Sequence, residues 1–570
     1  MKRRVHWLIP LVLLPGLVLP ACSKSEKSAP ATTEEAEGQE HDKGESAKPA
    51  SPTAAAEATP PPMQGFRGRG DGGDVSGGWA NKEREDLPQV DGVPVKPGDM
   101  YFEHYGVNPT IDTAEQPRST FAADVDNASY TMARAYLERG QLPVEAAVRV
   151  EEIVNAFDYG YEAPTSDVFA VHAEAAPSPN RKGYHVLHIG VKGKEVKRAA
   201  RKAANLTFVV DVSGSMDSDN RIGLVKRSLG LLVDQLGEAD KVGIVVYGST
   251  ARAVLEPTSA HDKQRILRAI DGLRTEGATN AEAGIRLGYQ MATRTFKEGG
   301  VNRVILCSDG VANVGMTGPD GLLDMIGRES NRGITISSIG FGMGNYNDVL
   351  MEKLANKGNG NYYYVDKLDE ARRVFVDQLT GTLEVIAKDV KIQVDFDKSV
   401  VARYRLIGYE NRALQAQDFD NDRVDAGEIG AGHAVTALYE VKLREGASGS
   451  LGTLRIRYKQ PTGSESSLVE KKLSREVVRA STDELSSPTQ LSLAAAQFAE
   501  KLRGSYWARN VSYEDITRRI DKLSMRERTD VSELKQLVQR ARQLDQRGDK
   551  FESQHGPIAR MDFDRVPVLR

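Results

Sequence analysis

Apolar runs typical of buried strands alternate with segments of helical apolar spacing between residues 206 and 383. A strand that is apolar along its whole length must be covered on both faces, and in an alternating pattern the covering elements are helices. The strand-like runs span residues 206–212, 242–247, 304–307, 334–339 and 362–365. The sequence therefore predicts a doubly wound α/β domain with a mostly parallel sheet over residues 204–385.

On both sides of this domain the apolar pattern changes to a period of two. Residues 389–479 alternate apolar with polar side chains, which is typical of an antiparallel sheet with one solvated face. Two strand-like runs, at 168–172 and 185–191, precede the α/β domain. We expect residues 166–200 and 386–480 to form a single β-sandwich into which the α/β domain is inserted.

Helical spacing is found at both outer ends of the part expected to fold. Residues 100–165 and 485–547 carry apolar side chains three or four positions apart. The tail, residues 548–570, has no such pattern and is expected to be unstructured. The sequence thus predicts helical N-terminal and C-terminal regions around the sandwich.

The first 22 residues have the pattern of an export signal. Residues 2–4 are basic, and the apolar stretch from 8 to 19 is too short and too rich in proline to span a membrane. Leu19-Pro-Ala-Cys22 resembles the bacterial lipoprotein box, which implies cleavage before Cys22 and attachment of lipid to this cysteine. We expect a protein of the bacterial cell envelope that is held to the membrane by a lipid on Cys22.

A disordered tether is expected between this anchor and the folded part. Residues 23–99 are rich in Ala, Glu, Pro, Ser and Gly and cannot bury enough apolar surface to offset the entropy of ordering. A flexible coil of this length spans on the order of 50 Å. By the same lipoprotein resemblance, Ser23 in place of Asp after the cysteine implies the outer membrane, facing either the periplasm or the exterior.

Composition argues against two classes of function. The net charge is -4, and no basic patch is interleaved with aromatic side chains, so nucleic acid is not expected as a partner. Cys307 is the only cysteine besides Cys22, and its apolar neighbours predict a buried thiol and not a nucleophile.

Oxygen-bearing side chains stand where the strands of the α/β domain end. In an open α/β sheet, ligands bind beyond the carboxyl ends of the strands, at the point where the strand order reverses. Carboxylate and hydroxyl oxygens suit hard cations, so we expect Mg²⁺, with Mn²⁺ or Ca²⁺ as alternatives. The candidate metal ligands are Asp211, Ser213, Ser215, Thr279 and Asp309.

These residues form the pattern Asp-x-Ser-x-Ser, followed by a distant Thr and a final Asp-Gly. The pattern resembles the metal-ion-dependent adhesion site of von Willebrand factor A (VWA) domains. The resemblance implies that Ser213, Ser215 and Thr279 contact the metal, and that Asp211 and Asp309 bind it directly or through water. It also implies a protein partner that presents Asp or Glu, because such a carboxylate can replace a water on the ion. Further stretches resemble bacterial lipoproteins that carry a VWA domain between dedicated N- and C-terminal regions; these stretches begin at Phe121, Val148, Gly340 and Leu406.

Other sites are indicated more weakly. The Gly-rich stretch 340–344 lacks the spacing of a nucleotide-binding loop. The acidic run 418–422 would begin a calcium loop, but Arg423 and Ile429 stand where that loop needs Gly and Glu. A hydrolase would need a general base; no His or Lys stands next to the metal motifs, and the only Glu residues there, Glu276 and Glu282, flank the segment of Thr279.

The function predicted from the sequence is therefore non-enzymatic, metal-dependent binding of a carboxylate-bearing protein by a lipid-anchored envelope protein. The main alternative is an envelope scaffold or assembly factor whose metal site is regulatory. A metal-dependent hydrolase is a third and weaker alternative. The sequence does not indicate the oligomeric state.

Overall fold

The computed structural model describes residues 100–197, 200–310, 318–342, 346–378, 383–461, 463 and 465–548. The predicted export signal and tether, including Cys22, lie outside the described residues, as does nearly all of the predicted tail. No described helix combines the length and the apolar character that a membrane span requires.

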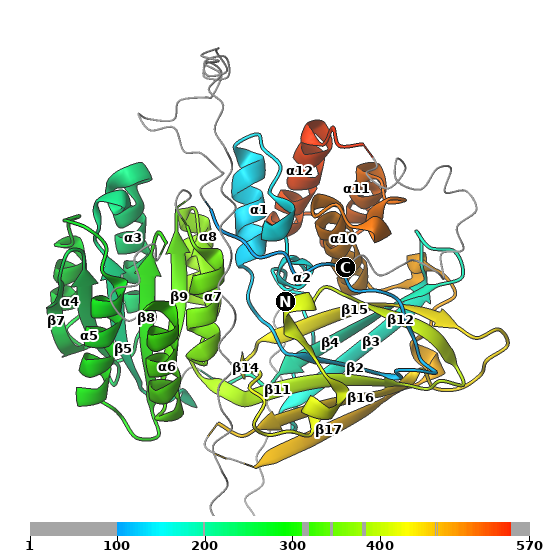
Figure 1. Cartoon of the computed structure of the whole chain (residues 1–570), viewed down its shortest axis with the longest axis horizontal. Helices are drawn as coiled ribbons and strands as arrows, with labels where there is room; N and C mark the ends of the chain where they lie inside the picture. The colour runs from blue at the N-terminus through cyan, green and yellow to red at the C-terminus, as the bar shows by residue number, and fades with distance from the viewer. Residues whose placement is uncertain are drawn as a thin grey trace, which may run out of the picture. The chain divides into compact units, whose positions relative to one another are not determined.

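A six-stranded sheet forms the centre of the α/β domain, in the order β10-β9-β8-β5-β6-β7 (Figure 1). Its strands are β5 (Ala204–Asp211), β6 (Lys241–Tyr247), β7 (Ala251–Ser259), β8 (Val301–Ser308), β9 (Ile334–Phe341) and β10 (Tyr362–Val365). All neighbours pair in parallel except β6 and β7, which are antiparallel. The strand order reverses at β5, which lies between β6 and β8, so a ligand crevice is expected where β5 ends.

Helices cover both faces of this sheet. They are α3 (Arg221–Gln235), α4 (Lys263–Asp271), α5 (Ala281–Arg294), α6 (Gly318–Asn331), α7 (Asp348–Lys357) and α8 (Leu368–Arg372), which continues into the π-helical segment η5 (Arg373–Gln378). One apolar cluster joins α3, α4 and α8 to the sheet, and another joins α5, α6 and α7. Phe208 and Val209 of β5 belong to different clusters, because successive residues of a strand point to opposite faces.

Two antiparallel sheets pack together as a β-sandwich. Their orders are β1-β12-β15-β4-β3 and β13-β2-β11-β16-β17, and β14 pairs with β11. The strands are β1 (Ile111–Asp112), β2 (Arg118–Ala122), β3 (Phe169–Pro177), β4 (His185–Gly193), β11 (Val385–Phe396), β12 (Val401–Ile407), β13 (Ala413–Leu414), β14 (Gly427–Gly430), β15 (Ala434–Leu443), β16 (Gly452–Lys459) and β17 (Ser466–Leu473). One apolar cluster takes Leu187 from β4 and Val394 from β11, so both sheets share a core. The predicted fold class is confirmed, because strands from before and after the α/β domain build one sandwich.

Three strands were not expected from the sequence. β1 and β2 precede the first helix, in the region where helical spacing dominates, and pair with β12 and β11 respectively. β7 forms an antiparallel edge next to β6. β1 has two residues and β2 has five, so their strand form depends on partners far along the chain and not on local periodicity.

The N-terminal and C-terminal helices form a layer with an apolar cluster of its own. The helices are α1 (Ala128–Glu138), α2 (Val150–Val154), α10 (Ser487–Leu502), α11 (Tyr513–Asp521) and α12 (Thr529–Leu544). α1 lies beside α12 and also packs along β10 (Figure 1). Short helical turns connect the larger elements: η2 (Glu145–Ala147), η4 (Gly214–Asn220), η6 (Glu410–Arg412), η7 (Ala416–Phe419), η8 (Arg475–Val477), η9 (Thr482–Glu484) and η10 (Tyr506–Ala508).

Two buried arginines tie the α/β domain to these helices, and we call them with their carboxylate partners the arginine seam. Arg149, next to α2, pairs with Asp348 and Glu352 of α7, the latter at 3.0 Å. Arg134 of α1 pairs with Glu370 of α8 at 3.0 Å. Removing charges from water is costly unless they are well paired, so the seam requires these elements to stay docked together.

Candidate metal centre

The candidate metal centre begins where β5 and β8 end side by side. The two strands are parallel neighbours, and Val210 is in register with Cys307, so Asp211 and Ser308 complete the strands at the same edge. The Ser308 hydroxyl donates a hydrogen bond of 2.9 Å to Oδ2 of Asp211. Side chains from two strands that are distant in sequence therefore meet at this edge.

The loop after β5 brings two hydroxyls to the same place. The backbone N–H of Ser213 donates to Oδ1 of Asp211 at 2.8 Å, which folds the loop back over the end of the strand. The hydroxyl oxygens of Ser213 and Ser215 lie 3.1 Å apart. Adjacent ligands of an octahedral Mg²⁺ also lie roughly 3 Å apart, since each is 2.0–2.1 Å from the ion. The spacing of these two hydroxyls therefore fits a shared hard cation.

Thr279 lies on a neighbouring loop, half-buried, directly before the N-cap of α5. The backbone N–H of Gly214 donates to the carbonyl of Gly277 at 3.2 Å, and this bond joins the two loops. Gly277 has a φ of +70°, and a Cβ there would lie 2.3 Å from the Ser249 hydroxyl. A side chain at Gly277 would displace the loop that carries Thr279.

Asp309 follows Ser308 and is held by an arginine that the sequence did not single out. Nη1 of Arg221, the first residue of α3, donates to Oδ2 of Asp309 at 2.6 Å and to the carbonyl of Ser215 at 3.3 Å. Both charged side chains are buried. Gly342, with a φ of +78°, makes room for this arginine, because a Cβ there would lie 2.2 Å from Nε.

The electrostatics of the centre favour a cation. Asp211 is fully buried and forms no ion pair with any described residue. Burial raises the pKa of its carboxyl above the usual value, and the nearby Asp309 adds to this, while hydrogen bonds from Ser213 and Ser308 oppose it. A cation at this position would stabilise the charged carboxylate.

The donor set of the predicted site has the chemistry of a hard-cation site. It contains two carboxylates and three hydroxyls, and the described residues nowhere gather three or more His, Cys, Asp or Glu side chains in a way that could hold a metal. Hydrogen bonds link Asp211, Ser213 and Ser215, a backbone bond connects the loop of Thr279, and Asp309 adjoins Ser308. The five predicted residues thus lie on three connected segments.

Ser308 and Arg221 are contributors that sequence reasoning missed. Ser308 directly precedes the Asp-Gly of residues 309–310, and its bond to Asp211 depends on the register of β5 and β8. Arg221 immediately precedes the apolar face of α3, and nothing local in the sequence connects it to Asp309. The predicted lipidation site, Cys22, lies outside the described residues.

Three family profiles match consecutive parts of the chain. The profile described as von Willebrand factor matches residues 96–188, and that described as von Willebrand factor type A domain matches residues 205–377. The profile described as uncharacterized protein YfbK, C-terminal, matches residues 381–544. VWA domains often mediate protein binding, and they commonly bind a divalent metal at the adhesion site.

One relative in sequence matches this chain over most of the length of both proteins. Uncharacterized protein YfbK from Escherichia coli (strain K12) is 39% identical over 447 residues, which cover 74% of this chain and 77% of that protein. Inter-alpha-trypsin inhibitor heavy chain H3 from Homo sapiens is 22% identical over 266 residues, which cover 42% of this chain and 29% of that protein.

Solved structures with a similar fold are more distant. The von Willebrand factor type A structure from Catenulispora acidiphila has a TM-score of 0.40 and 16% identity, covering 68% of this chain and 97% of that one. Proximal thread matrix protein 1 from the mussel byssus, with a zinc-occupied MIDAS motif, has a TM-score of 0.27 and 22% identity, covering 31% of this chain and 45% of that one.

The long match to YfbK and the order of the family profiles agree with the architecture of the chain. The VWA profile covers the α/β domain, and the YfbK C-terminal profile covers the strands and helices that follow it. The resemblance to VWA-containing bacterial proteins that the sequence motifs indicated is thereby confirmed. The chain belongs to the family of YfbK-like bacterial proteins, in which a VWA domain precedes a YfbK C-terminal domain.

Proposed function

We propose that this protein binds a carboxylate-bearing protein partner through a divalent metal ion at the VWA domain. The observation that carries the proposal is that Asp211, Ser213 and Ser308 meet where β5 and β8 end. The hydroxyl oxygen of Ser215 lies 3.1 Å from that of Ser213 at the same place. The residues that would hold the ion are Asp211, Ser213, Ser215, Thr279 and Asp309.

The residues of the centre suit binding of a partner because most of them are neutral. A bound Mg²⁺ would supply an under-neutralised positive charge that attracts an Asp or Glu of the partner. Ser215 is exposed, whereas Asp211 and Ser213 are buried, so the centre opens to solvent on the side of Ser215. The partner's carboxylate would approach from that side.

We propose binding and not catalysis, because the described part of the centre supplies no group suited to act as a general base. Besides Asp211 and Asp309, ionisable side chains near the centre include Arg221, which is a permanent cation, and Tyr247, whose pKa burial raises well above its usual value. On the Thr279 segment, Glu276 pairs with Arg252 and Glu282 pairs with Arg286. Asp309 is engaged by Arg221, and Asp211 accepts hydrogen bonds from Ser213 and Ser308. Hydrolysis of an ester or phosphate that is lost in Asp211→Asn would contradict this part of the proposal.

We further propose that the protein is anchored by a lipid on Cys22, in the outer membrane and facing the periplasm or the exterior. This rests on the basic start, the short apolar stretch and the Leu-Pro-Ala-Cys box of residues 1–22. Metabolic labelling with a fatty-acid analogue should mark the wild-type protein and not Cys22→Ser. Labelling of both proteins would contradict a lipid on Cys22.

The metal-dependent function is tested by calorimetry and a pull-down. We expect saturable Mg²⁺ or Mn²⁺ binding by the wild type and by Asp234→Asn, and none by Asp211→Asn; Asp234 is an exposed residue at the far end of α3. A partner from envelope extract should be retained by the wild type with Mg²⁺ and released by chelator. Retention that survives both chelation and Asp211→Asn would overturn the proposal.

That last outcome would favour a second function, an envelope scaffold or assembly factor with a regulatory metal site. The arginine seam supports this alternative, since buried ion pairs join the VWA domain to the helices around it. A rigid connection of this kind suits a protein that holds other components in fixed positions.

A further inference from the structure

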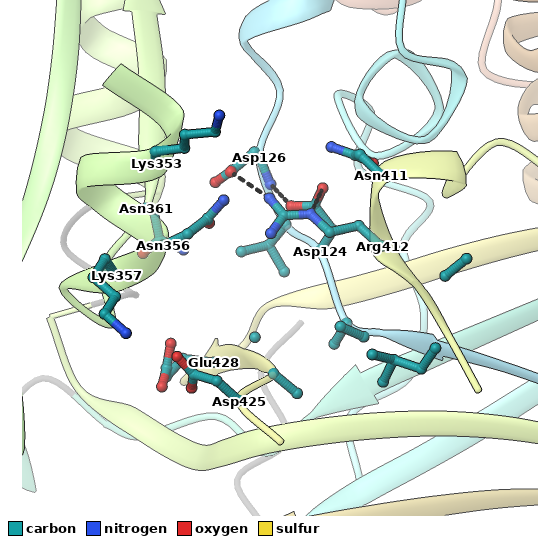
Figure 2. Close-up of a pocket in the computed structure, with 18 of the residues that line it drawn as sticks. Asp124, Asp126, Lys353, Asn356, Lys357, Asn361, Asn411, Arg412, Asp425 and Glu428 are labelled. Carbon is teal, nitrogen blue, oxygen red and sulfur yellow. Dashed lines mark hydrogen bonds and ion pairs between the residues drawn. The ribbon is translucent and has the colours of Figure 1, made fainter. Parts of the chain in front are cut away.

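A second site with ligand-binding character lies far from the metal centre. A pocket of about 360 Å³ is lined by the end of α7, the turn that follows it, and the segments 122–126, 411–414 and 425–428 (Figure 2). α7 leads into the start of β10, whereas the metal centre lies where β5 and β8 end. Because these strands are parallel, the pocket and the metal centre lie at opposite edges of the sheet.

One side of the pocket is acidic and lacks a cationic partner. Asp425 and Glu428 line it next to each other (Figure 2), and neither forms an ion pair with a described residue. Oε1 of Glu428 is enclosed and accepts no hydrogen bond from the described residues. Asp389 of β11 adds a third carboxylate nearby, but its own partner is Lys459 at 2.7 Å.

The charges around these carboxylates do not balance them. Burial, the charge of Asp389 and a hydrogen bond with Asp389 together raise the pKa of Asp425 to about 6. Burial also raises the pKa of Glu428 well above its usual value, and Asp425 and Asp389 add to this. The cations that face the pair are Lys357 of α7, Lys388 of β11 and Arg303 of β8, and they oppose the shifts without cancelling them.

The facing side of the pocket offers amide groups. Asn356 and Asn361 come from α7 and from the turn after it, across the pocket from Asp425 and Glu428 (Figure 2). Asn361 is only 7% exposed, yet its side chain forms no hydrogen bond with the described residues. The amide of Asn361 is therefore open to the pocket, and a polar ligand could bond to it in place of water.

An anionic ligand does not suit the pocket. Arg412 is already bonded to Asp124 at 3.0 Å and to Asp126 at 3.2 Å (Figure 2), and also to Glu352 at 3.2 Å. The other cations in the lining are Lys353, which pairs with Glu103 at 3.8 Å, and Lys357, whose charge acts on Asp425. The backbone between Asp425 and Glu428 packs tightly against Ala123. A Cβ at Gly427 would lie 2.0 Å from the carbonyl oxygen of Ala123, so only glycine fits this close approach. The backbone therefore packs closely there, and the acidic side is formed before any ligand arrives.

We propose that this pocket binds a small organic cation through a primary ammonium group, with Asp425 and Glu428 accepting its hydrogen bonds and Asn361 bonding to the polar remainder. The volume lies at the small end of ligand sites, which suits a short amine or one side chain and not a folded domain. The ammonium could belong to a free amine or to a lysine of a peptide. This site is independent of the metal-dependent function proposed above.

The proposal is tested by calorimetry on the full chain with two probes, 1,4-diaminobutane and a short peptide containing one lysine. We expect saturable binding that weakens at least tenfold in Asp425→Asn and in Glu428→Gln. Asp420→Asn is the matched control, because Asp420 lies five positions before Asp425, outside the pocket lining, with a side chain that is 79% exposed. Tighter binding of either probe identifies the source of the ammonium.

Two further measurements distinguish binding in this pocket from nonspecific attraction of a cation and from binding at the metal centre. A bound ammonium favours the charged carboxylates, so binding near pH 6.5 should release protons, and Glu428→Gln should release fewer. Binding should persist in chelator and in Asp211→Asn. Any one of three results would overturn the proposal. These are equal affinity in the wild type and Asp425→Asn, no saturable binding of either probe at millimolar concentration, and loss of binding in Asp211→Asn.

Discussion

At the scale of single residues, Arg221 places a fixed positive charge beside the candidate metal centre. Its bonds to Asp309 and to the carbonyl of Ser215 hold two of the predicted ligand segments together. A guanidinium is charged at all relevant pH values, so it repels a nearby cation even as it orients Asp309. If the centre binds a metal as proposed, Arg221 would lower its affinity without being a ligand.

Replacing this arginine should tighten metal binding. We expect Arg221→Gln to bind Mn²⁺ at least several-fold more tightly, because a unit charge about 4 Å from the ion is worth about 1 kcal/mol even in bulk water and more near a protein surface. Calorimetry measures the change, and Arg227→Gln, an exposed position on the same helix, should leave the affinity unaltered. Weaker binding by Arg221→Gln would show that orienting Asp309 matters more than repulsion.

Glu151 is a buried carboxyl whose folded-state pKa is raised to about 8, first by burial and then by Glu410 and Asp124. Below pH 4.5 both folded and unfolded chains keep the proton, so the group does not affect stability. As the pH rises to 8, the unfolded chain releases a proton that the folded chain retains, and this favours unfolding. The carboxyl therefore destabilises the fold progressively between pH 4.5 and 8.

Glu151→Gln should remove this effect while keeping an oxygen that accepts from the N–H of Tyr409. We expect a gain in the free energy of unfolding on the order of a few kcal/mol at pH 8 and almost none at pH 4.5. Urea unfolding at both pH values checks the prediction. Glu298→Gln, on the surface, should change neither value, and an equal gain at both pH values in Glu151→Gln would contradict the stated cause.

At the scale of helices and strands, replacing either of two helix glycines with alanine should change the stability of the protein in opposite directions. A Cβ at Gly284 of α5 would lie 2.5 Å from the ring of Tyr247 on β6, whereas a Cβ at Gly230 of α3 would meet nothing closer than 4.0 Å. Alanine favours a helix over glycine by about 1 kcal/mol, so Gly230→Ala should stabilise the protein. Gly284→Ala should destabilise it by roughly 1–3 kcal/mol through overpacking. Thermal unfolding of both variants tests the pair, and stabilisation by both would contradict the close packing of α5.

The strands that the sequence predicts well are those whose burial is visible locally. In β5 every residue is buried, so the apolar run Phe208-Val-Val210 marks the strand without knowledge of its partners. β1, β2 and β7 are too short or too polar for that, and pairing with other strands decides their form.

The metal centre also has a part that is visible locally in the sequence and a part that depends on tertiary contacts. Asp211, Ser213 and Ser215 form a local motif, whereas the bonds of Ser308 and Arg221 depend on strand register and on where α3 begins. Metal binding itself stays a prediction.

At the scale of the whole molecule, the arginine seam makes the docking of the VWA domain depend on buried charge. Arg149→Leu would leave Asp348, Glu352 and Glu152 without their main cation. We expect a loss of about 3–5 kcal/mol in the free energy of unfolding, because uncompensated buried charges are costly. Faster hydrogen exchange in α7 should accompany this loss. Arg294→Leu breaks an exposed pair with Glu256 and should cost less than about 1 kcal/mol. Equal losses in the two variants would contradict the role of the seam.

The insertion of the VWA domain into the sandwich also sets an order of events during synthesis. β4 pairs with β3 as soon as both exist, but its other neighbour, β15, begins at Ala434, about 240 positions after β4 ends. At roughly 5–20 residues per second, that strand is made about 10–50 s later. Until then the hairpin keeps an apolar strand edge open, the kind of edge on which chains aggregate. Until β15 is available, the β3–β4 hairpin is therefore expected to need protection from aggregation.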